Sequence, residues 1–467
     1  MTANPQTAAP VPVAFVVNGQ LVEGADVLLE TRGLSTPFAT PKLDLDALTS
    51  GRHIAGPAFD LPTSEVIDFL VATGERLRLA DNVFLQEALD HMVRVNPLGR
   101  RIVGQIYDEL GALFDRESLQ FQLQVELGDA YALDGWREVQ DPKGRRSDVR
   151  AIPPRLVHVL AGNAPTVSAV SIVRGALTKG VNVLKLPSND LFTATAILRT
   201  MAEIDPEHPT LRSFSAVYWR GGDDAVESVL YRPQWFDKLV AWGGEGAIRS
   251  ALRYVGPGFE LVSFDPKTSI SLIGREAFSS DSALRQVADL GAADATICNQ
   301  EACGAARFQF IEGSVDDADR YCEQLAVELS VDRPTASAVG PPTPAEIRVE
   351  VDVLRHLEPD YRVWGTFDGH GLVIRSDEPV EFIPIGKTVN VIPVASLEDA
   401  VRYVTVATQT VGVYPSDRKT VLRDALGGAG AQRIVPLGHG VDFAEGLPHD
   451  GIYPLQRLVR WVVDEGR

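Results

Sequence analysis

The sequence predicts an α/β protein with two successive Rossmann-type domains, each built on a parallel β-sheet. From residue 155, apolar strand patterns such as VNVLKLP (181–187) alternate with helical patterns such as PTVSAVSIVRGALTKG (165–180), and a second series runs from about 281 to 437. Strands that alternate with amphipathic helices are typical of βαβ units, in which helices cover both faces of the sheet. Two such units predict an active-site cleft between the domains, beyond the carboxyl ends of the strands.

The other elements follow from local patterns. Residues 13–31 predict short strands around a hairpin turn at Asn18–Gly19, and residues 63–127 have helical spacing. The Pro-rich stretch 339–347 predicts a surface loop, and SLEDAVRYVTVA (396–407) predicts a helix. Further strands are expected at LVHVLAG (156–162), FSAVYW (214–219), FDKLVAW (236–242), ELVSF (260–264), FQFIEG (308–313), TVNVIPV (388–394) and RIVPLG (433–438).

Composition and charge narrow the class of partner. The 467 residues include 44 Lys and Arg against 63 Asp and Glu, which gives a net charge of −19. Such an acidic surface repels phosphate backbones and anionic lipids, which argues against nucleic acid and membrane surfaces as partners. The chain has three cysteines and no apolar run near the ~18 residues that a membrane span needs, and its first residues lead us to expect no signal peptide. We therefore expect a soluble protein of the reducing cytoplasm, without membrane insertion.

Two polar residues stand where strands of the first series end. Asn163 lies in AGNAPT (161–166), between a strand and a helix, where its side-chain amide either donates to an oxyanion or caps the helix. Lys185 closes an apolar strand and either extends to solvent or contacts a phosphate or ribose. Position alone leaves both alternatives open.

Glycines open the helix that follows the strand at 236–242. Gly243, Gly244 and Gly246 let the backbone approach a diphosphate at a helix N-terminus, although an ordinary glycine turn explains them too. The dinucleotide fingerprint G-x-G-x-x-G is absent, and Gly386-Lys387-Thr388 lacks the first glycine of a P-loop. No metal-ligand spacing and no serine nucleophile elbow occur, so we expect no metal site.

The segment ICNQEACGAARFQFIEG (297–313) holds the candidate nucleophile. Cys303 is followed by Gly304 and two alanines, which leave a thiol accessible and backbone N–H groups free to stabilise an anion. Cys298 and Cys322 stand in apolar or helical patterns and are expected to have packing roles. A single cysteine in a loop is a candidate and no more.

Together, these segments resemble the aldehyde-dehydrogenase superfamily, and within it the acyl-CoA reductases similar to the fatty-acid reductase component of bacterial luminescence systems. AGNAP resembles the oxyanion asparagine motif, VLKLPSND the Lys-Pro-Ser cofactor motif, WGGEG the glycine turn at the cofactor diphosphate, and CNQEACG the nucleophile loop. The resemblance covers roughly residues 150–465. It implies that Cys303 and Asn163 are catalytic and that the nicotinamide nucleotide contacts Lys185, Pro187, Ser188, Gly243, Gly244 and Gly246.

The sequence departs from the superfamily at two carboxylates. Aligning FDPK (264–267) with the family's Glu-Leu-Gly-Gly-Lys puts Ser263 where the general base stands, and Glu260 is three residues out of register. Hydrolysis of an acyl-enzyme needs such a base, whereas transfer to or from a thiol needs none. The acid that holds the adenosine ribose is displaced to Asp190, beyond Ser188 and Asn189, which favours NADPH while leaving NADH open.

The resemblance implies reduction of a fatty acyl thioester, such as an acyl-CoA, to the aldehyde through an acyl-cysteine on Cys303, with NADPH or NADH as the hydride donor. The alternatives are an aldehyde dehydrogenase that works oxidatively with Glu260 as base, and a nucleotide-binding scaffold without turnover. An acyl-protein synthetase is an expected partner, and a homo-oligomer, dimer or tetramer, is an expected assembly. His449 is expected to close a turn.

The expected domain organisation follows the same resemblance. Residues 1–270 form the N-terminal elements and the cofactor domain, with an oligomerisation arm near 120–150. Residues 271–440 form the catalytic domain with Cys303, and residues 441–467 return to the cofactor domain or to a subunit interface.

Overall fold

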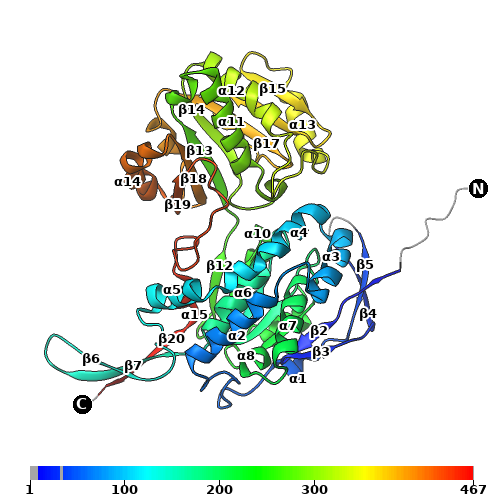
Figure 1. Cartoon of the computed structure of the whole chain (residues 1–467), viewed down its shortest axis with the longest axis vertical. Coiled ribbons are helices and arrows are strands. Elements are labelled where there is room, and N and C mark those ends of the chain that lie inside the picture. Colours follow the sequence, from blue (N-terminus) through cyan, green and yellow to red (C-terminus); the bar gives the residue numbers. More distant parts are fainter. Residues whose placement is uncertain (1–8, 32–34, 466–467) are drawn as a thin grey trace, which may run out of the picture. The chain divides into compact units, whose positions relative to one another are not determined.

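The computed structural model describes residues 9–31 and 35–465 (Figure 1). The chain forms two compact units: Met1–Asp265 with Glu445–Arg467, here called unit 1, and Pro266–Ala444, here called unit 2. The C-terminal segment thus packs with the N-terminal half of the chain. No helix among the described residues is both long enough and apolar enough to cross a membrane.

A seven-stranded sheet forms the centre of unit 1, in the order β12-β11-β8-β9-β10-β2-β3. Strands β8 to β12 are parallel, and β2 and β3 add an antiparallel hairpin at one edge. The hairpin turns at Asn18 and Gly19, which both have positive φ, as predicted. The strands are β2 (Phe15–Val17), β3 (Gln20–Val22), β8 (Arg155–Val159), β9 (Val181–Lys185), β10 (Phe214–Val217), β11 (Lys238–Trp242) and β12 (Glu260–Phe264).

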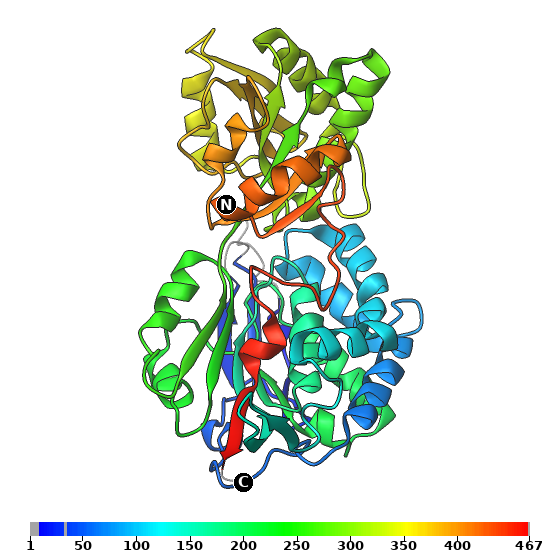
Figure 2. The ribbon, with the colours of Figure 1, turned by 90° about the vertical axis from the view of Figure 1, so that its left-hand side faces the viewer.

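Helices cover both faces of this sheet. Figure 2 shows the green helices α9 and α10 on one side and the blue to cyan helices on the other. The strand order reverses at β8, which lies between β9 and β11 although it precedes both in the sequence. Ligands of open α/β sheets bind at such a switch point, outside the carboxyl ends of the strands. The helices are α1 (Leu45–Leu48), α2 (Thr63–Arg76), α3 (Val83–Val95), α4 (Gly99–Glu109), η1 (Leu110–Phe114), α5 (Arg116–Leu127), α6 (Thr166–Leu177), α7 (Thr193–Ile204), α8 (Pro209–Arg212), α9 (Asp224–Leu230), α10 (Glu245–Leu252) and α15 (Pro454–Leu458).

Two small sheets complete unit 1. One joins β1 (Val11–Pro12), β5 (Pro37–Thr40) and β4 (Val27–Glu30). The other joins β20 (Arg460–Glu465), β7 (Arg146–Ile152) and β6 (Arg137–Gln140), and it extends away from the helices of the unit (Figure 1). The segment expected near 120–150 as an arm is therefore helical up to Leu127, and its strands begin at Arg137.

Unit 2 also contains a seven-stranded sheet, in the order β15-β16-β17-β14-β13-β18-β19, parallel except for the edge strand β15. Its strands are β13 (Thr268–Ile273), β14 (Ala306–Glu312), β15 (Tyr361–Thr366), β16 (Gly371–Ser376), β17 (Thr388–Val394), β18 (Thr408–Tyr414) and β19 (Arg433–Pro436). Its helices are η2 (Arg275–Phe278), α11 (Asp281–Ala295), η3 (Ile297–Gln300), α12 (Val315–Glu328), α13 (Ala345–Leu354), η4 (Asp399–Tyr403), η5 (Ser416–Arg418) and α14 (Lys419–Ala429).

The helix predicted at 396–407 is wrong in extent, because only the 3₁₀ turn η4 forms there. Leu397, Ala400 and Val404 are buried in the core of unit 2, so the apolar spacing correctly marks the inward positions. Val404, Thr405 and Val406 are β-branched and disfavour continuation of the helix. The chain straightens there and enters β18.

Candidate active site

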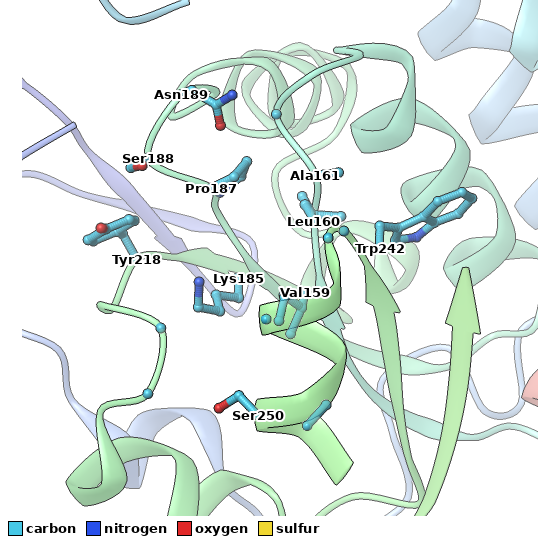
Figure 3. Close-up of a pocket in the computed structure, with 18 of the residues that line it drawn as sticks. Val159, Leu160, Ala161, Lys185, Pro187, Ser188, Asn189, Tyr218, Trp242 and Ser250 are labelled. Atoms are coloured by element: carbon cyan, nitrogen blue, oxygen red, sulfur yellow. The ribbon is translucent and has the colours of Figure 1, made fainter. Parts of the chain in front are cut away.

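A pocket of about 710 Å³ lies at the switch point of the unit 1 sheet, at the carboxyl ends of its parallel strands. Its walls are the loops that follow β8, β9, β10 and β11, together with the start of α10 (Figure 3). The volume lies within the range usual for small-molecule and cofactor sites. All the sequence-predicted residues of unit 1 line it: Asn163, Lys185, Pro187, Ser188, Gly243, Gly244 and Gly246.

Lys185 is the last residue of β9 and lines this pocket instead of extending to bulk solvent. Its residue exposure is 8%, and its Nζ lies 5.8 Å and 5.6 Å from the ring centres of Tyr218 and Trp219. Figure 3 shows the side chain between Tyr218 and Val159. A cation held in a protein wall attracts a phosphate or ribose oxygen more strongly than one in free solvent.

The glycine turn after β11 is shaped to leave space above the start of α10. Gly243 has a φ of 146°, which side chains rarely adopt, and Gly244 is the N-cap of α10 without any side-chain cap. A Cβ added at Gly244 or Gly246 would meet no atom within 4 Å. The turn therefore presents helix N–H groups to the pocket, which is the arrangement that binds phosphate oxygens.

Asn163 lies on the loop between β8 and α6 and lines the same pocket. Helix α6 begins at Thr166, and its N-cap residue is Pro165, which has no side-chain cap bond. Asn96 holds this loop in place, because its Nδ2 donates to the carbonyl oxygens of Gly162 (2.8 Å) and Asn189 (2.9 Å). One buried amide thus ties the Asn163 loop to the loop that follows Lys185.

Asp190 does not offer its carboxylate to the pocket. Its side chain is fully buried, and its Oδ1 accepts the N–H of Thr193 at the start of α7. Burial raises the pKa of Asp190 to about 6 against the opposing hydrogen bonds. The wall of the pocket is instead formed by Ser188 and Asn189.

Glu260 lies at the end of its strand that is away from the pocket, so it is not placed to serve as a base there. It is the first residue of β12 and pairs in register with Lys238, the first residue of β11, whereas the pocket borders Trp242 at the other end of β11. Four residues of strand span roughly 13 Å. The Glu260 carboxylate forms an ion pair with Lys238 Nζ at 3.1 Å, which explains an exposed acid at this position without a catalytic role.

Cys303 lies in unit 2, on the loop between η3 and β14, and is half-buried. Gln409 Nε2 donates to Cys303 Sγ at 3.1 Å, and Ser269 Oγ donates to the Cys303 carbonyl at 2.8 Å. Gln409 and Ser269 are the second residues of β18 and β13. The thiol therefore lies at the amino ends of the unit 2 strands. The expectation that the site lies beyond carboxyl ends holds for the pocket of unit 1 and is wrong for the thiol.

The other two cysteines are buried, as their sequence patterns predict. Cys322 is fully buried in the core between α11 and α12, and burial raises its thiol pKa well above the usual value. Cys298 is 6% exposed.

A left-handed turn precedes the thiol. Cys298, Asn299 and Gln300 have φ values of 51°, 53° and 72°, a conformation that costs free energy in non-glycine residues. Side-chain hydrogen bonds hold it: Gln300 exchanges two bonds with the backbone of Thr388, at 2.7 and 3.0 Å, and Asn299 Oδ1 accepts the N–H of Ser337 at 2.8 Å. Asn299 and Gln300 therefore fix the backbone that leads to Cys303.

Lys387 lies in the Gly-Lys-Thr sequence that does not match a P-loop, and its side chain helps to hold the segment that binds Asn299. Its side chain is 2% exposed, and Nζ donates to the carbonyl oxygens of Ser337 (2.9 Å) and Ala338 (3.0 Å). Burial lowers the pKa of Lys387 to about 8.

Two guanidinium groups act on the thiol electrostatically. Burial lowers the pKa of Arg307 and of Arg433. The charge of Glu301 opposes this effect for Arg307, those of Asp294 and Asp442 oppose it for Arg433, and negative charge on Cys303 makes a smaller contribution of the same sign in both. Each is held by backbone carbonyls: Arg307 by Pro384 (2.6 Å), and Arg433 by Gly440 (2.8 Å). A cation beside a cysteine favours the thiolate, which is the nucleophilic form.

Sequence reasoning missed Asn96, Gln409 and both arginines. Asn96 gave one weak signal, since it stands before Pro97 and ends a helical pattern. Gln409 and Arg433 stand 106 and 130 residues after Cys303 along the chain, so only the strand order brings them to it.

His449 closes a turn with Ile452, as expected, and its Nδ1 also contacts Arg174 at 3.2 Å.

Residues 9–31 and 35–465 contain no group of three His, Cys, Asp or Glu side chains that is arranged to hold a metal ion. The polar groups described above suit a different ligand. A cation, open helix N–H groups and small side chains along one pocket fit the diphosphate and ribose of a nicotinamide nucleotide.

Known proteins share this architecture. Aldehyde dehydrogenase 21 from Physcomitrella patens superimposes with a TM-score of 0.73 at 14% sequence identity, covering 98% of this chain and 99% of that one. A NAD-dependent benzaldehyde dehydrogenase from Corynebacterium glutamicum gives a TM-score of 0.72 at 14% identity, covering 97% and 98%. The aldehyde-dehydrogenase-like α/β fold expected from the sequence is confirmed.

Sequence relatives narrow the family. The long-chain acyl-protein thioester reductase of Vibrio harveyi is 27% identical over 97% of this chain and 92% of the relative. The protein of the same name from Photorhabdus luminescens is 30% identical over 87% and 83%. The model of the family described as acyl-CoA reductase (LuxC) matches residues 58–461. This chain is therefore a member of the acyl-CoA reductase (LuxC) family.

Proposed function

We propose that this protein reduces an acyl thioester, with a fatty acyl group, to the aldehyde through an acyl-cysteine on Cys303. The observation that carries the proposal is the environment of the thiol: a half-buried sulfur with an amide donor at 3.1 Å and two nearby guanidinium charges. Those groups favour a thiolate nucleophile. Membership of the acyl-CoA reductase family gives the same reaction class.

In the proposed reaction, the Cys303 thiolate attacks the thioester carbonyl, whose oxygen takes the negative charge. Asn163 and the backbone N–H of Cys303 hold that oxyanion. Collapse breaks the bond to the donor thiol, which leaves as a thiolate and takes a proton, and the acyl group stays on Cys303. When bound, NAD(P)H supplies the hydride that reduces this acyl carbon. Cys303 then leaves as a thiolate and the aldehyde is released.

Lys185, Pro187, Ser188 and the Gly243–Gly246 turn hold the nucleotide in this proposal. NADPH is the proposed preference, because Ser188 and Asn189 line the pocket while the Asp190 carboxylate is buried away from it. A carboxylate at that place would repel a 2′-phosphate.

Reduction is favoured over oxidation to an acid because neither of the two positions considered for a base is suited to activate water. Ser263 stands where a glutamate base would be, and Glu260 is at the far end of β12. An acyl-cysteine without an activated water persists until hydride or a thiol reaches it.

The acyl donor is proposed to be a coenzyme A thioester or an acyl group on an acyl-protein synthetase. The second donor is suggested by the names of the curated relatives, which are acyl-protein thioester reductases.

We also propose a cytoplasmic homo-oligomer, with the β6–β7–β20 sheet as its arm. An acidic chain with a net charge of −19 suits neither nucleic acid nor an anionic membrane surface.

Covalent labelling tests the proposal directly. Wild-type protein incubated with a radiolabelled long-chain acyl-CoA should retain label after denaturation and release it as aldehyde when NADPH is added. Cys303→Ala should take up no label but still bind NADPH, since the pocket of unit 1 keeps all its residues. Cys298→Ala, a change at a buried thiol in the same segment, should label normally. Normal labelling of Cys303→Ala, or aldehyde formation by it, would show that the nucleophile is elsewhere.

A further inference from the structure

Gln409 is placed to act on the sulfur of Cys303. It is the second residue of β18, is 2% exposed, and donates from Nε2 to Sγ at 3.1 Å. Neither the sequence patterns nor the family motifs point to this residue.

The neighbouring hydrogen bonds fix both partners. Ser269 Oγ donates to the carbonyl of Cys303 at 2.8 Å and accepts the N–H of Thr410, the residue next to Gln409, at 3.2 Å. Ser269 of β13 therefore joins the backbone of Cys303 to the backbone of β18 directly beside Gln409. A donor fixed in advance costs no reorganisation when charge develops on the sulfur.

We propose that Gln409 is a catalytic residue: its side-chain amide stabilises Cys303 as a thiolate, before attack on the acyl group and again as the leaving group of the thiohemiacetal. This inference rests on the proposed function. A hydrogen bond to an anion is about twice as strong as one to a neutral acceptor, so the amide favours the thiolate over the thioester.

The leaving step shows why such a donor matters. The oxyanion that hydride addition leaves on the thiohemiacetal re-forms the carbonyl of the aldehyde, the carbon–sulfur bond breaks, and the electron pair of that bond stays on sulfur. The amide of Gln409 keeps its protons throughout, so it assists at any pH at which the protein is folded. Arg307 and Arg433 add positive charge, but their guanidinium groups are engaged by backbone carbonyls of Pro384 and Gly440.

The test uses two substitutions with different packing consequences. Gln409→Glu keeps the shape and replaces the donor by an acceptor, and Gln409→Leu removes the polar group. The pH dependence of Cys303 alkylation by iodoacetamide should shift upward by about one pH unit or more in both variants, from the loss of one charge-assisted hydrogen bond. In single-turnover reactions, release of aldehyde from the acyl-enzyme should slow about 10- to 100-fold. The KM for the acyl thioester should change much less than kcat.

Gln432→Leu is the matched control. Gln432 donates its amide to the backbone carbonyl of Val406, just before β18, and not to the sulfur, so its removal should leave the alkylation profile unchanged. If folded Gln409→Glu and Gln409→Leu titrate and release aldehyde like the wild type, the role of Gln409 is refuted while the proposed function stands. If wild-type Cys303 takes up no acyl group at all, the proposed function itself fails.

Discussion

Lys185 is the residue on which we expect the proposed nucleotide binding in unit 1 to depend most. Its ammonium group is held in the pocket wall near the faces of Tyr218 and Trp219, at 5.8 and 5.6 Å from their ring centres. Lys185→Met keeps the length of the side chain and removes the charge. We expect NADPH affinity to fall about 10- to 100-fold, the usual loss for a charge-assisted contact, as measured by fluorescence titration.

The same variant should leave the chemistry of the thiol intact. Cys303 alkylation and acylation by acyl-CoA should proceed at wild-type rates, because Lys185 belongs to unit 1 and the groups around the sulfur belong to unit 2. Lys143→Met, an exposed lysine in the turn between β6 and β7, is the control for loss of one positive charge. An unchanged affinity in Lys185→Met would remove Lys185 from the cofactor site.

At the scale of single residues, the sequence indicates chemistry where the signal is local. Cys303 stands out because small residues follow it, and Lys185 because it ends an apolar strand. Gln409 has no local signal: its neighbours in TQTVGVY form an ordinary buried strand. Its role arises from the pairing of β18 with β13, which a single sequence does not specify.

Helix α5 and the C-terminal segment are joined by a buried acid. Glu126, 1% exposed, accepts the N–H of Leu455 through Oε2 at 2.5 Å. Burial raises the pKa of Glu126 to about 7, although the Leu455 N–H and Arg174 act in the opposite direction. The segment that returns to unit 1 is thus anchored by a group that titrates near neutral pH.

This anchor predicts a pH-dependent stability. The folded pKa of about 7 exceeds the usual 4.5, so the folded state binds more protons between these values. The contribution of Glu126 is therefore present at low pH and is lost as the pH rises through 7. Glu126→Gln cannot ionise, and its melting temperature should exceed that of the wild type by a few degrees at pH 8 and match it near pH 5. Glu117→Gln, at an exposed site on the same helix, should show no such divergence. If the melting temperatures of wild type and Glu126→Gln differ by the same amount at every pH from 5 to 8, the assignment is contradicted.

Elements were predictable where periodicity and turn chemistry agree. The Asn18–Gly19 hairpin, the strands of the first series and the helices between 63 and 127 are confirmed. The segment 396–407 has helical spacing but β-branched residues at its end, and the second property decides its structure. The neighbours of the thiol on β13 and β18 also escaped prediction, because strand order is set by long-range pairing.

At the scale of the whole molecule, the three-stranded sheet β6–β7–β20 leaves apolar groups in solvent. Every residue of β20 is exposed, including Trp461 (43%), Val462 (37%) and Val463 (50%). Val139 on β6 is 51% exposed. In the described part of the chain both outer strands also lack a partner on one side. Exposed apolar side chains on open strand edges are typical of surfaces that associate.

We therefore predict that a second copy of the chain covers this sheet and that one added charge separates the copies. Val463→Lys should convert the oligomer to a monomer in light scattering coupled to size-exclusion chromatography, without loss of the circular dichroism of the fold. Val421→Lys, at a 74% exposed valine on α14 of unit 2, is the control and should stay oligomeric. Lysine at the sheet adds a charge that must be desolvated on association, whereas at Val421 it remains in water. A wild-type chain that is monomeric at micromolar concentration, or a Val463→Lys variant of unchanged mass, would show that β20 is not an interface.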